Sequence, residues 1–312
     1  MAAVTAVLPN KDANRATALT LYTGEVLKAF RERNIGLSLV KKRNIVGGKS
    51  AQFIVTGAAA ESDIQTHVRG AEVVGNLLAN DEVTITVSTR YVHSHFIDGL
   101  DNHIAQYDAT SELAFQSGNV LAIKVDKDIF DQFAAAVVAT PKTGQVAAAK
   151  VVATGYAAAT TAADRGNFIV TALFESTTAL DERDVTEMPV FVTTPKVKYE
   201  LVQSNAINKD LTTANGGLDS GNIAMVAGIP ITWTNHLGGT AVSNLIAAGV
   251  NELLGYVTTK DVIGVVSAMD ITSDSWEDKR RLGNQYVSYY ALGMGILNPT
   301  GLVEIGSDGA PA

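Results

Sequence analysis

The feature that most constrains the fold is a pair of short strand patterns separated by a long, weakly apolar excursion. Phe53 begins one strand, which ends at Gly57, and residues 83 to 88 alternate apolar and polar side chains as a half-exposed strand does. The residues between them are small, polar and punctuated by glycine. An isolated two-stranded hairpin is marginally stable in water. The pattern therefore predicts a protruding hairpin that needs a neighbour.

Helical periodicity lies on both sides of this hairpin. Apolar positions at helical spacing predict a helix over residues 19 to 30 and a long amphipathic helix over residues 98 to 138, with Asp98 at its start and a bend at Gly118. A linker is predicted over residues 140 to 166 and a helix over residues 167 to 183.

The C-terminal half is predicted to consist mainly of strands and turns. Pro195 marks a helix start, because proline suits the first helical turn. Residues 285 to 297 and 302 to 305 predict a hairpin joined at Asn298-Pro299. The remaining predictions are strands over residues 189 to 192, 224 to 234, 253 to 257 and 262 to 268, and an exposed loop over residues 205 to 222.

Composition favours an α+β fold of one large or two modest domains. The 312 residues are 46% hydrophobic, which is enough to bury a sizeable core. With 27 glycines and 6% aromatic residues, the chain has many turns and does not suit a helical bundle.

Charge is unevenly distributed. The net charge is −8, so the surface as a whole repels phosphate backbones and dedicated nucleic-acid binding is not predicted. Residues 25 to 49 hold seven basic side chains against two acidic ones, a local balance of +5 that leaves −13 for the rest. A basic segment on an acidic body favours head-to-tail contact between copies.

Several classes of protein are disfavoured. The chain has no cysteine, which removes disulfides, thiolate nucleophiles and cysteine-ligated zinc and is compatible with a reducing cytoplasm. The N-terminal residues lack the basic and apolar regions of a secretory signal, and no apolar run is long enough for a bilayer. We predict no membrane association.

Candidate chemical sites each have a structural explanation. Gly48-Lys49-Ser50 resembles the end of a phosphate-binding loop, but Arg43 stands where that motif needs its first glycine. His93 and His95 lie on one face of a predicted strand, with His103 beyond, yet no carboxylate follows at a ligand spacing. Exposed or hydrogen-bonded histidines are the prediction here and for His236. We predict no catalytic residue, no metal and no cofactor.

Two further groups of side chains also have structural explanations. Glu182, Asp184 and Glu187 read as a solvated helix end. Trp233 and Trp276 are predicted to be core or interface anchors.

Several blocks in the same order along the chain resemble the major capsid proteins of short-tailed (podovirus, autographivirus-like) double-stranded DNA bacteriophages. The resemblance spans most of residues 20 to 306. The blocks that carry it are Gly24-Glu25-Val26-Leu27, Gly48-Lys49-Ser50-Ala51-Gln52-Phe53, Tyr107-Asp108-Ala109-Thr110-Ser111-Glu112, Val190-Phe191-Val192-Thr193-Thr194-Pro195, Gly228-Ile229-Pro230-Ile231, Leu254-Gly255-Tyr256-Val257 and Tyr289-Tyr290-Ala291-Leu292-Gly293-Met294-Gly295.

The resemblance implies the Hong Kong 97 capsid fold, an α+β fold with a long spine helix. Its parts would be an N-terminal arm (1–42), an extended loop (43–92), a peripheral domain (93–140 and 269–306), an axial domain (141–268) and a C-terminal tail (307–312). The implied function is that of a major capsid protein of the virion, assembled in the host cytoplasm through hexamers and pentamers into an icosahedral shell. Such a shell encloses the phage DNA without sequence-specific binding, and the family implies a scaffolding protein and a portal as partners.

The charge pattern and this resemblance together predict which residues form contacts between subunits and which act as hinges. We predict inter-subunit contacts at Lys41, Lys42, Arg43, Lys49 and Phe53, and hinges at Gly47, Gly48 and Gly118. Two alternatives stay open. One is an encapsulin, a cellular cargo compartment of the same fold, and the other is a metal-dependent enzyme that uses His93 and His95.

Overall fold

The structure is a computed structural model that describes residues 11–56, 64, 66–70, 72, 75, 80–98, 109–142, 144–204, 225–237 and 252–309. The chain divides into two compact units. Unit 1 comprises Met1–Asn34, Val87–Val125 and Ser267–Gly293, and unit 2 comprises Ile35–Thr86, Asp126–Val266 and Met294–Ala312. Each unit is therefore assembled from three separate stretches of sequence.

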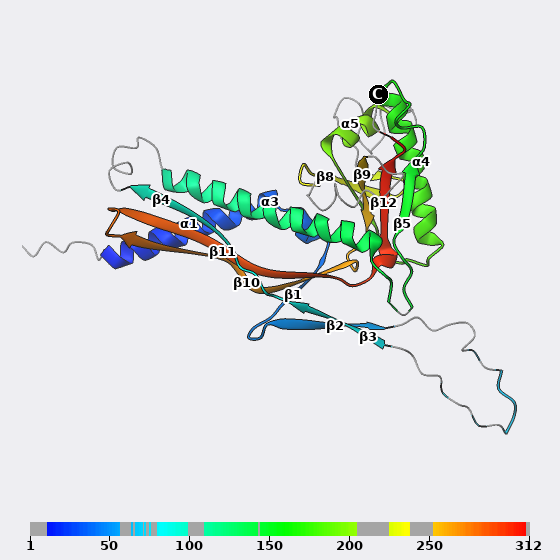
Figure 1. Cartoon of the computed structure of the whole chain (residues 1–312), viewed down its shortest axis with the longest axis horizontal. Helices are drawn as coiled ribbons and strands as arrows, with labels where there is room; N and C mark the ends of the chain where they lie inside the picture. Colours follow the sequence, from blue (N-terminus) through cyan, green and yellow to red (C-terminus); the bar gives the residue numbers. More distant parts are fainter. Residues whose placement is uncertain are drawn as a thin grey trace, which may run out of the picture. The chain divides into compact units, whose positions relative to one another are not determined.

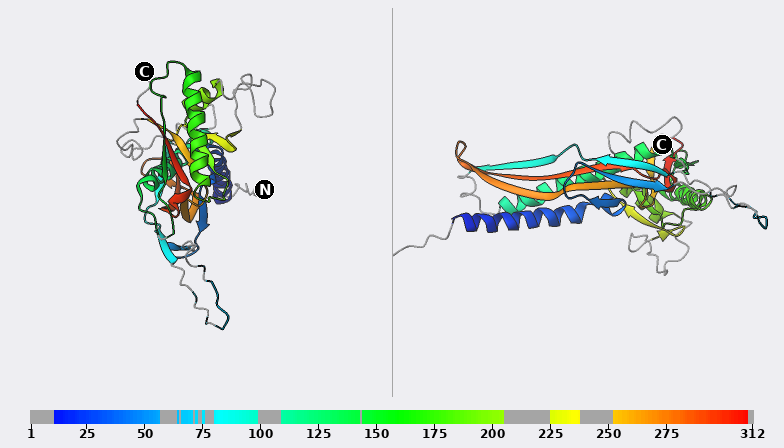
Figure 2. Two further views of the ribbon diagram at one scale, coloured as in Figure 1. Left: turned by 90° about the vertical axis from the view of Figure 1, so that its right-hand side faces the viewer. Right: turned by 90° about the horizontal axis from the view of Figure 1, so that it is seen from below.

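Unit 1 packs two helices on one face of a sheet. The helices are α1 (Lys11–Arg33) and the first part of α3 (Ala109–Val138). The strands are β4 (Tyr91–Asp98) and parts of β10 (Ile263–Asp278) and β11 (Gly283–Ile296), with β11 between the other two and antiparallel to β4. Figure 2 shows α1 running alongside these strands. Tyr22, Val26 and Ala114 of the helices bury against Ile271 and Tyr286 of the sheet.

Unit 2 is built on a mixed six-stranded sheet in the order β5-β12-β9-β6-β8-β7 (Figure 1). Its strands are β5 (Ala149–Ala153), β12 (Leu302–Ser307), β9 (Leu253–Thr258), β6 (Val190–Thr193), β8 (Ile229–Trp233) and β7 (Met225–Val226). The β5–β12 and β6–β8 pairs are parallel, and the other pairs are antiparallel.

A large hydrophobic core of unit 2 lies between this sheet and the helices α4 (Ala162–Asp181) and α5 (Pro195–Gln203). Alternate strand residues such as Phe191, Val257 and Val303 point into it. Local chemistry sets where these helices begin. Thr161 caps α4 by accepting a hydrogen bond from the Asp164 amide at 3.1 Å, and Pro195 occupies the first turn of α5.

Unit 2 also carries a two-stranded ribbon. β2 (Ser50–Thr56) pairs antiparallel with β3 (Asn80–Thr86), in a register that places Phe53 opposite Val83. β1 (Lys41–Asn44), which precedes the ribbon, is the edge strand beside β10 in the order β1-β10-β11-β4. Two short 3₁₀ helices complete the description, η1 (Gly36–Ser38) and η3 (Pro299–Gly301).

A buried carboxylate joins three distant segments of unit 2. Asp126 in α3 is fully buried and accepts hydrogen bonds from the amides of Ile35 and Gly36, the latter at 2.9 Å. Its other oxygen lies 2.8 Å from Nδ1 of His236, in the segment after β8. Burial raises the pKa of Asp126, and the hydrogen bonds from His236, Gly36 and Ile35 oppose that rise.

Most predicted elements are confirmed. The hairpin strands are β2 and β3, residues 19 to 30 lie within α1, and residues 167 to 181 lie within α4. The strands predicted near 190, 254 and 263 are β6, β9 and β10, and α5 begins at Pro195. The predicted loop over 205–222 lies outside the described residues.

Three predictions are wrong. Asp98 belongs to β4 and not to the long helix, which is described from Ala109 onward. The supposed linker contains β5 and the start of α4. The C-terminal hairpin is not formed, because β11 pairs with β4 and β10 whereas β12 pairs with β5 and β9. Residues 302–306, assigned in the prediction to a peripheral domain, therefore lie in the six-stranded sheet.

Replacing Asp126 tests the buried junction. We expect Asp126→Ala to lower the free energy of unfolding by roughly 3–5 kcal/mol, because the two amides and His236 lose their shared acceptor in a buried site. Urea denaturation followed by circular dichroism measures the loss. The control Glu112→Ala removes an exposed carboxylate from the same helix. Equal midpoints for the two variants would contradict a structural role for Asp126.

Candidate assembly surface

The ribbon base is the surface where β2 and β3 join the rest of unit 2. Its exposed part begins with β1. All four residues of this edge strand are exposed, and the turn that follows reaches Val46, whose side chain is fully exposed. Gly47 and Gly48 have φ angles of +73° and +112°, in the region that favours glycine. These two glycines let the chain turn sharply from β1 into β2.

Lys41 is held within its own chain. Its Nζ lies 2.8 Å from Oδ1 of Asp261. The hydrogen bond from Lys41 keeps the pKa of Asp261 below its usual value. Desolvation and the neighbouring Asp261 raise the pKa of Glu187. One lysine thus lies beside a pair of adjacent carboxylates, and Glu187, which is exposed as predicted, also interacts with Asp261.

Arg43 connects β1 to the ribbon. Its guanidinium donates a hydrogen bond to the carbonyl of Gln52 at 2.8 Å and lies 5.8 Å from the centroid of the Phe53 ring. Phe53 is half-buried. Arginine stacks on aromatic rings while keeping its charge near water, so this contact orders the start of β2 without removing the charge.

Lys142 holds the other strand of the ribbon. Its Nζ lies 3.4 Å from Oδ2 of Asp81 and donates to the carbonyl of Glu82 at 2.8 Å. The amide of Glu82 and the cation of Lys142 keep the pKa of Asp81 below its ordinary value. Both strands are therefore attached to the rest of unit 2, β2 through Arg43 and β3 through Lys142 at its first residues.

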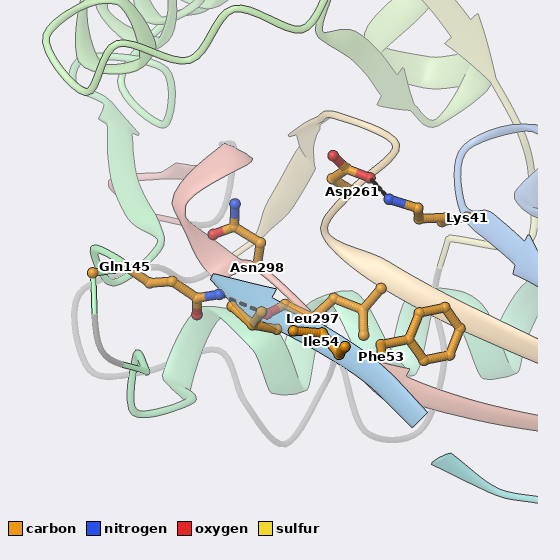
Figure 3. A pocket seen from close by; sticks show the side chains of 9 residues that line it. Lys41, Phe53, Ile54, Gln145, Asp261, Leu297 and Asn298 are labelled. Carbon is orange, nitrogen blue, oxygen red and sulfur yellow. Dashed lines mark hydrogen bonds and ion pairs between the residues drawn. The ribbon is translucent and has the colours of Figure 1, made fainter. Parts of the chain in front are cut away.

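A groove of about 280 Å³ lies at this base. Figure 3 shows the Lys41–Asp261 pair near its upper edge and the Gln145 side chain extending toward Leu297. The amide of Gln145 donates to the Leu297 carbonyl at 2.9 Å. Ile54, which is 78% exposed, lines the groove. The lining residues are Lys41, Phe53, Ile54, Val55, Gly144, Gln145, Asp261, Leu297 and Asn298.

The predicted contact residues lie in β1, in the turn that follows it and in β2. Lys41, Arg43 and Phe53 make the contacts within the chain that are described above, and Lys42 and Lys49 are exposed. The sequence did not identify Asp261, Glu187 and Lys142 as partners of this region. Each is far away in sequence, and a single charged residue in a loop carries no spacing signal.

The three glycines predicted as hinges differ in their surroundings. A side chain at Gly47 or Gly48 would meet open space, although both backbones favour glycine. Gly118 lies where α3 crosses α1, and a Cβ there would be 2.5 Å from the Val26 carbonyl oxygen and 2.8 Å from the Ala29 Cβ. Close helix packing therefore accounts for glycine at this position, and hinge motion at all three positions stays a prediction.

The histidines are embedded in packing contacts. His93 and His95 lie on one face of β4 with ring centroids 4.4 Å apart, and Nδ1 of His93 lies 3.2 Å from Oγ of Ser117. Burial lowers the pKa of both rings. Within the described ranges no group of three or more potential metal-ligating side chains is found. His103 lies outside the described residues.

Other sequence motifs also have structural surroundings. Gly48-Lys49-Ser50 leads into β2 and not into a helix N-terminus, which a phosphate-binding loop would require. No helix within the described part of the chain combines the length and apolarity needed to cross a bilayer.

The fold is shared with solved shell proteins. The chain resembles the subunit in "Capsid structure of the Cyanophage P-SCSP1u" with a TM-score of 0.73 and 24% identity, covering 89% of each chain. It resembles the subunit of a virus-like particle from Pyrococcus furiosus with a TM-score of 0.58 and 11% identity, covering 92% of this chain and 98% of that one. The fold is thus the Hong Kong 97 type of phage capsid proteins.

Sequence comparison identifies the family. Residues 52–306 match the Gp10A-like family, described as a major capsid protein. The major capsid protein of Escherichia phage T7 is 24% identical over 310 residues, which cover 91% of this chain and 90% of that protein. The chain belongs to the Gp10A-like family of major capsid proteins. The encapsulin alternative has no better support than this assignment.

The Lys41–Asp261 pair makes a pH-dependent prediction. The folded-state pKa of Asp261 lies below its ordinary value, so its contribution to stability is present above that value and disappears as the pH falls through the folded pKa. We expect Lys41→Met to raise the pKa of Asp261, as measured by NMR titration of its carboxyl carbon. Lys42→Met, one position along the same strand, should leave that pKa unchanged. Identical titrations in both variants would rule out the pairing.

Glycine substitutions in the two helices should have opposite effects. Gly118→Ala forces a methyl group into α1 and should cost about 1–3 kcal/mol of unfolding free energy. Gly24→Ala places a methyl group in open space on α1 and should stabilise by about 0.5–1 kcal/mol. Thermal unfolding of both variants provides the comparison. A neutral Gly118→Ala would mean that the helices separate easily there.

Proposed function

We propose that this chain assembles through hexamers and pentamers into an icosahedral shell that encloses a phage double-stranded DNA genome. The observation that carries the proposal is the family match over residues 52–306, together with the likeness of the fold to a phage capsid over 89% of the chain. Assembly takes place in the host cytoplasm with a scaffolding protein and a portal as partners.

Within this proposal the parts of the chain take different roles. Residues 1–42 form the arm and residues 43–92 the extended loop. Residues 93–140 and 269–301 form the peripheral domain. Residues 141–268 form the axial domain, to which strand β12 is added because it pairs with β5 and β9. The shell surrounds the DNA without reading its sequence, in keeping with the net charge of −8.

The contacts at the ribbon base support an assembly role for the exposed side chains beside it. Lys41, Arg43, Lys142 and their partners hold the ribbon on its own subunit. Lys42 and Lys49 are exposed and add positive charge to a chain of negative net charge. They contact a neighbouring subunit and steer its approach. Gly47, Gly48 and Gly118 are the proposed hinges for changes in shell shape.

Electron microscopy of the purified chain tests the shell directly. The wild-type protein should form uniform polyhedral particles. We expect the double variant Lys42→Glu and Lys49→Glu to lose assembly, because it replaces attraction between copies with repulsion. Far-UV circular dichroism should show that the variant subunit is still folded. The control pair Lys127→Glu and Lys260→Glu makes the same change in net charge at other exposed lysines. Normal shells from Lys42→Glu with Lys49→Glu would remove the electrostatic role, and a wild-type chain that stays monomeric would refute the shell.

A further inference from the structure

A group of polar side chains lies between the helices and the sheet of unit 1. Nδ1 of His93 in β4 lies 3.2 Å from Oγ of Ser117 in α3, and the same Oγ lies 3.2 Å from the Tyr22 hydroxyl in α1. Ser117 and Tyr22 are buried. These contacts connect one strand to both helices that cover it. We call His93, His95, Ser117 and Tyr22 the histidine cluster.

His95 extends the cluster toward β11. It follows His93 by two residues, so both rings lie on the same face of β4, with their centroids 4.4 Å apart. The strand register places His95 opposite Tyr286 of β11, and the Tyr286 ring stacks on Tyr22 with centroids 5.0 Å apart. Tyr22 and Tyr286 belong to the hydrophobic contacts between α1 and the sheet. Both imidazoles therefore lie beside the contacts that hold α1 in place.

Protonation of the two rings is unfavourable in this position. The His95 ring is half-buried, and its Nε2 is enclosed without a hydrogen-bond partner among the described residues. A protonated imidazole donates from both nitrogens, so protonated His95 would bury an N–H group that has no acceptor. A charge on His93 as well would add repulsion between the two rings. The geometry therefore favours neutral imidazoles.

Among the described residues, few charged side chains face the histidine cluster. On α1, from residue 19 onward, Glu25 is half-buried and lies one turn from Tyr22, and on α3 Glu112 and Lys124 are exposed. Strand β11 carries no charged side chain. Ile271 and Ser273 of β10 face the helices, so acidic residues of β4 and β10 alternate onto the other face of the sheet, namely Asp98, Asp270 and Asp274. Burial lowers the pKa of both rings, and the charge of His93 lowers the pKa of His95 further.

We propose that His93 and His95 form a pH-sensitive switch between the sheet and the helices of unit 1. At neutral pH both rings are uncharged, and the contacts through Ser117 and Tyr22 hold α3 and α1 on the sheet. In weak acid the rings take up protons, and positive charge enters the histidine cluster. The two helices then loosen from β4. The switch is a property of the single subunit and goes beyond the proposed assembly.

The pH range follows from the direction of the pKa shifts. An imidazole in an unfolded chain has a pKa of about 6.5. Because the folded-state pKa of each ring is lower, the neutral rings stabilise the fold fully above about pH 6.5. This contribution is lost as the pH falls from there toward the folded-state pKa. Asp261, whose pKa lies below its ordinary carboxyl value, loses its contribution only at lower pH.

Thermal unfolding of unassembled subunits at about pH 7.5 and about pH 5 tests the switch. Between these conditions we expect the melting temperature of the wild type to fall by a few degrees more than that of a variant with His93→Gln and His95→Gln. Glutamine is polar and does not titrate. The control His67→Gln removes an exposed histidine from unit 2 and should behave as the wild type does. An equal fall in the wild type and the double variant would overturn the switch.

Amide hydrogen exchange of the wild-type chain gives a second readout, which does not require the variants to fold. At about pH 5, after correction for the intrinsic exchange rate, residues 19–33 of α1 should lose protection while α4 of unit 2 keeps it. Unchanged protection in α1 would contradict the proposal, and so would an equal loss in both helices, which would indicate global unfolding. Neither measurement requires particles, so failure of the switch would leave the proposed shell intact.

Discussion

The buried carboxylate of Asp126 is the interaction on which the arrangement of unit 2 depends. It holds the backbone of Ile35 and Gly36, six residues or fewer before β1, and the ring of His236 after β8. Gly36 must be small, because a Cβ there would lie 2.9 Å from Ile129 and 3.0 Å from Asp126. A charge in this position is tolerated because several donors surround it, although burial still raises its pKa.

This junction determines where β1 enters the sheet, and β1 in turn determines where the ribbon starts. The charged residues in and beside the ribbon have two roles, one within the subunit and one proposed between subunits. Lys41, Arg43 and Lys142 satisfy groups within the chain and attach the base of the ribbon. Lys42 and Lys49 are exposed and are the side chains proposed to contact another copy. The contacts within the chain thus attach the ribbon to its own subunit without help from a neighbouring copy.

Much of the fold followed from local patterns. The ribbon strands, α4, α5 and β9 were predictable because burial imposes a period of two or 3.6 residues on the apolar positions. The start of the long helix was placed wrongly at Asp98, because the alternating burial pattern of β4 continues to that residue. The linker concealed β5, a five-residue strand of Ala, Lys and Val that pairs in parallel with β12 more than 140 residues later. The residues around β5 do not indicate which distant strand it will pair with.

The sequence by itself determined the class of fold, the uneven charge and the residues that could serve in assembly, since each is a property of composition or of neighbours along the chain. Only the tertiary structure decided which partners from distant parts of the chain those residues meet. Lys41 and Asp261 are 220 positions apart in the sequence, yet the Lys41 Nζ lies 2.8 Å from the Asp261 carboxylate. This pairing depends on what folding brings beside the strand, which neighbours along the chain do not encode.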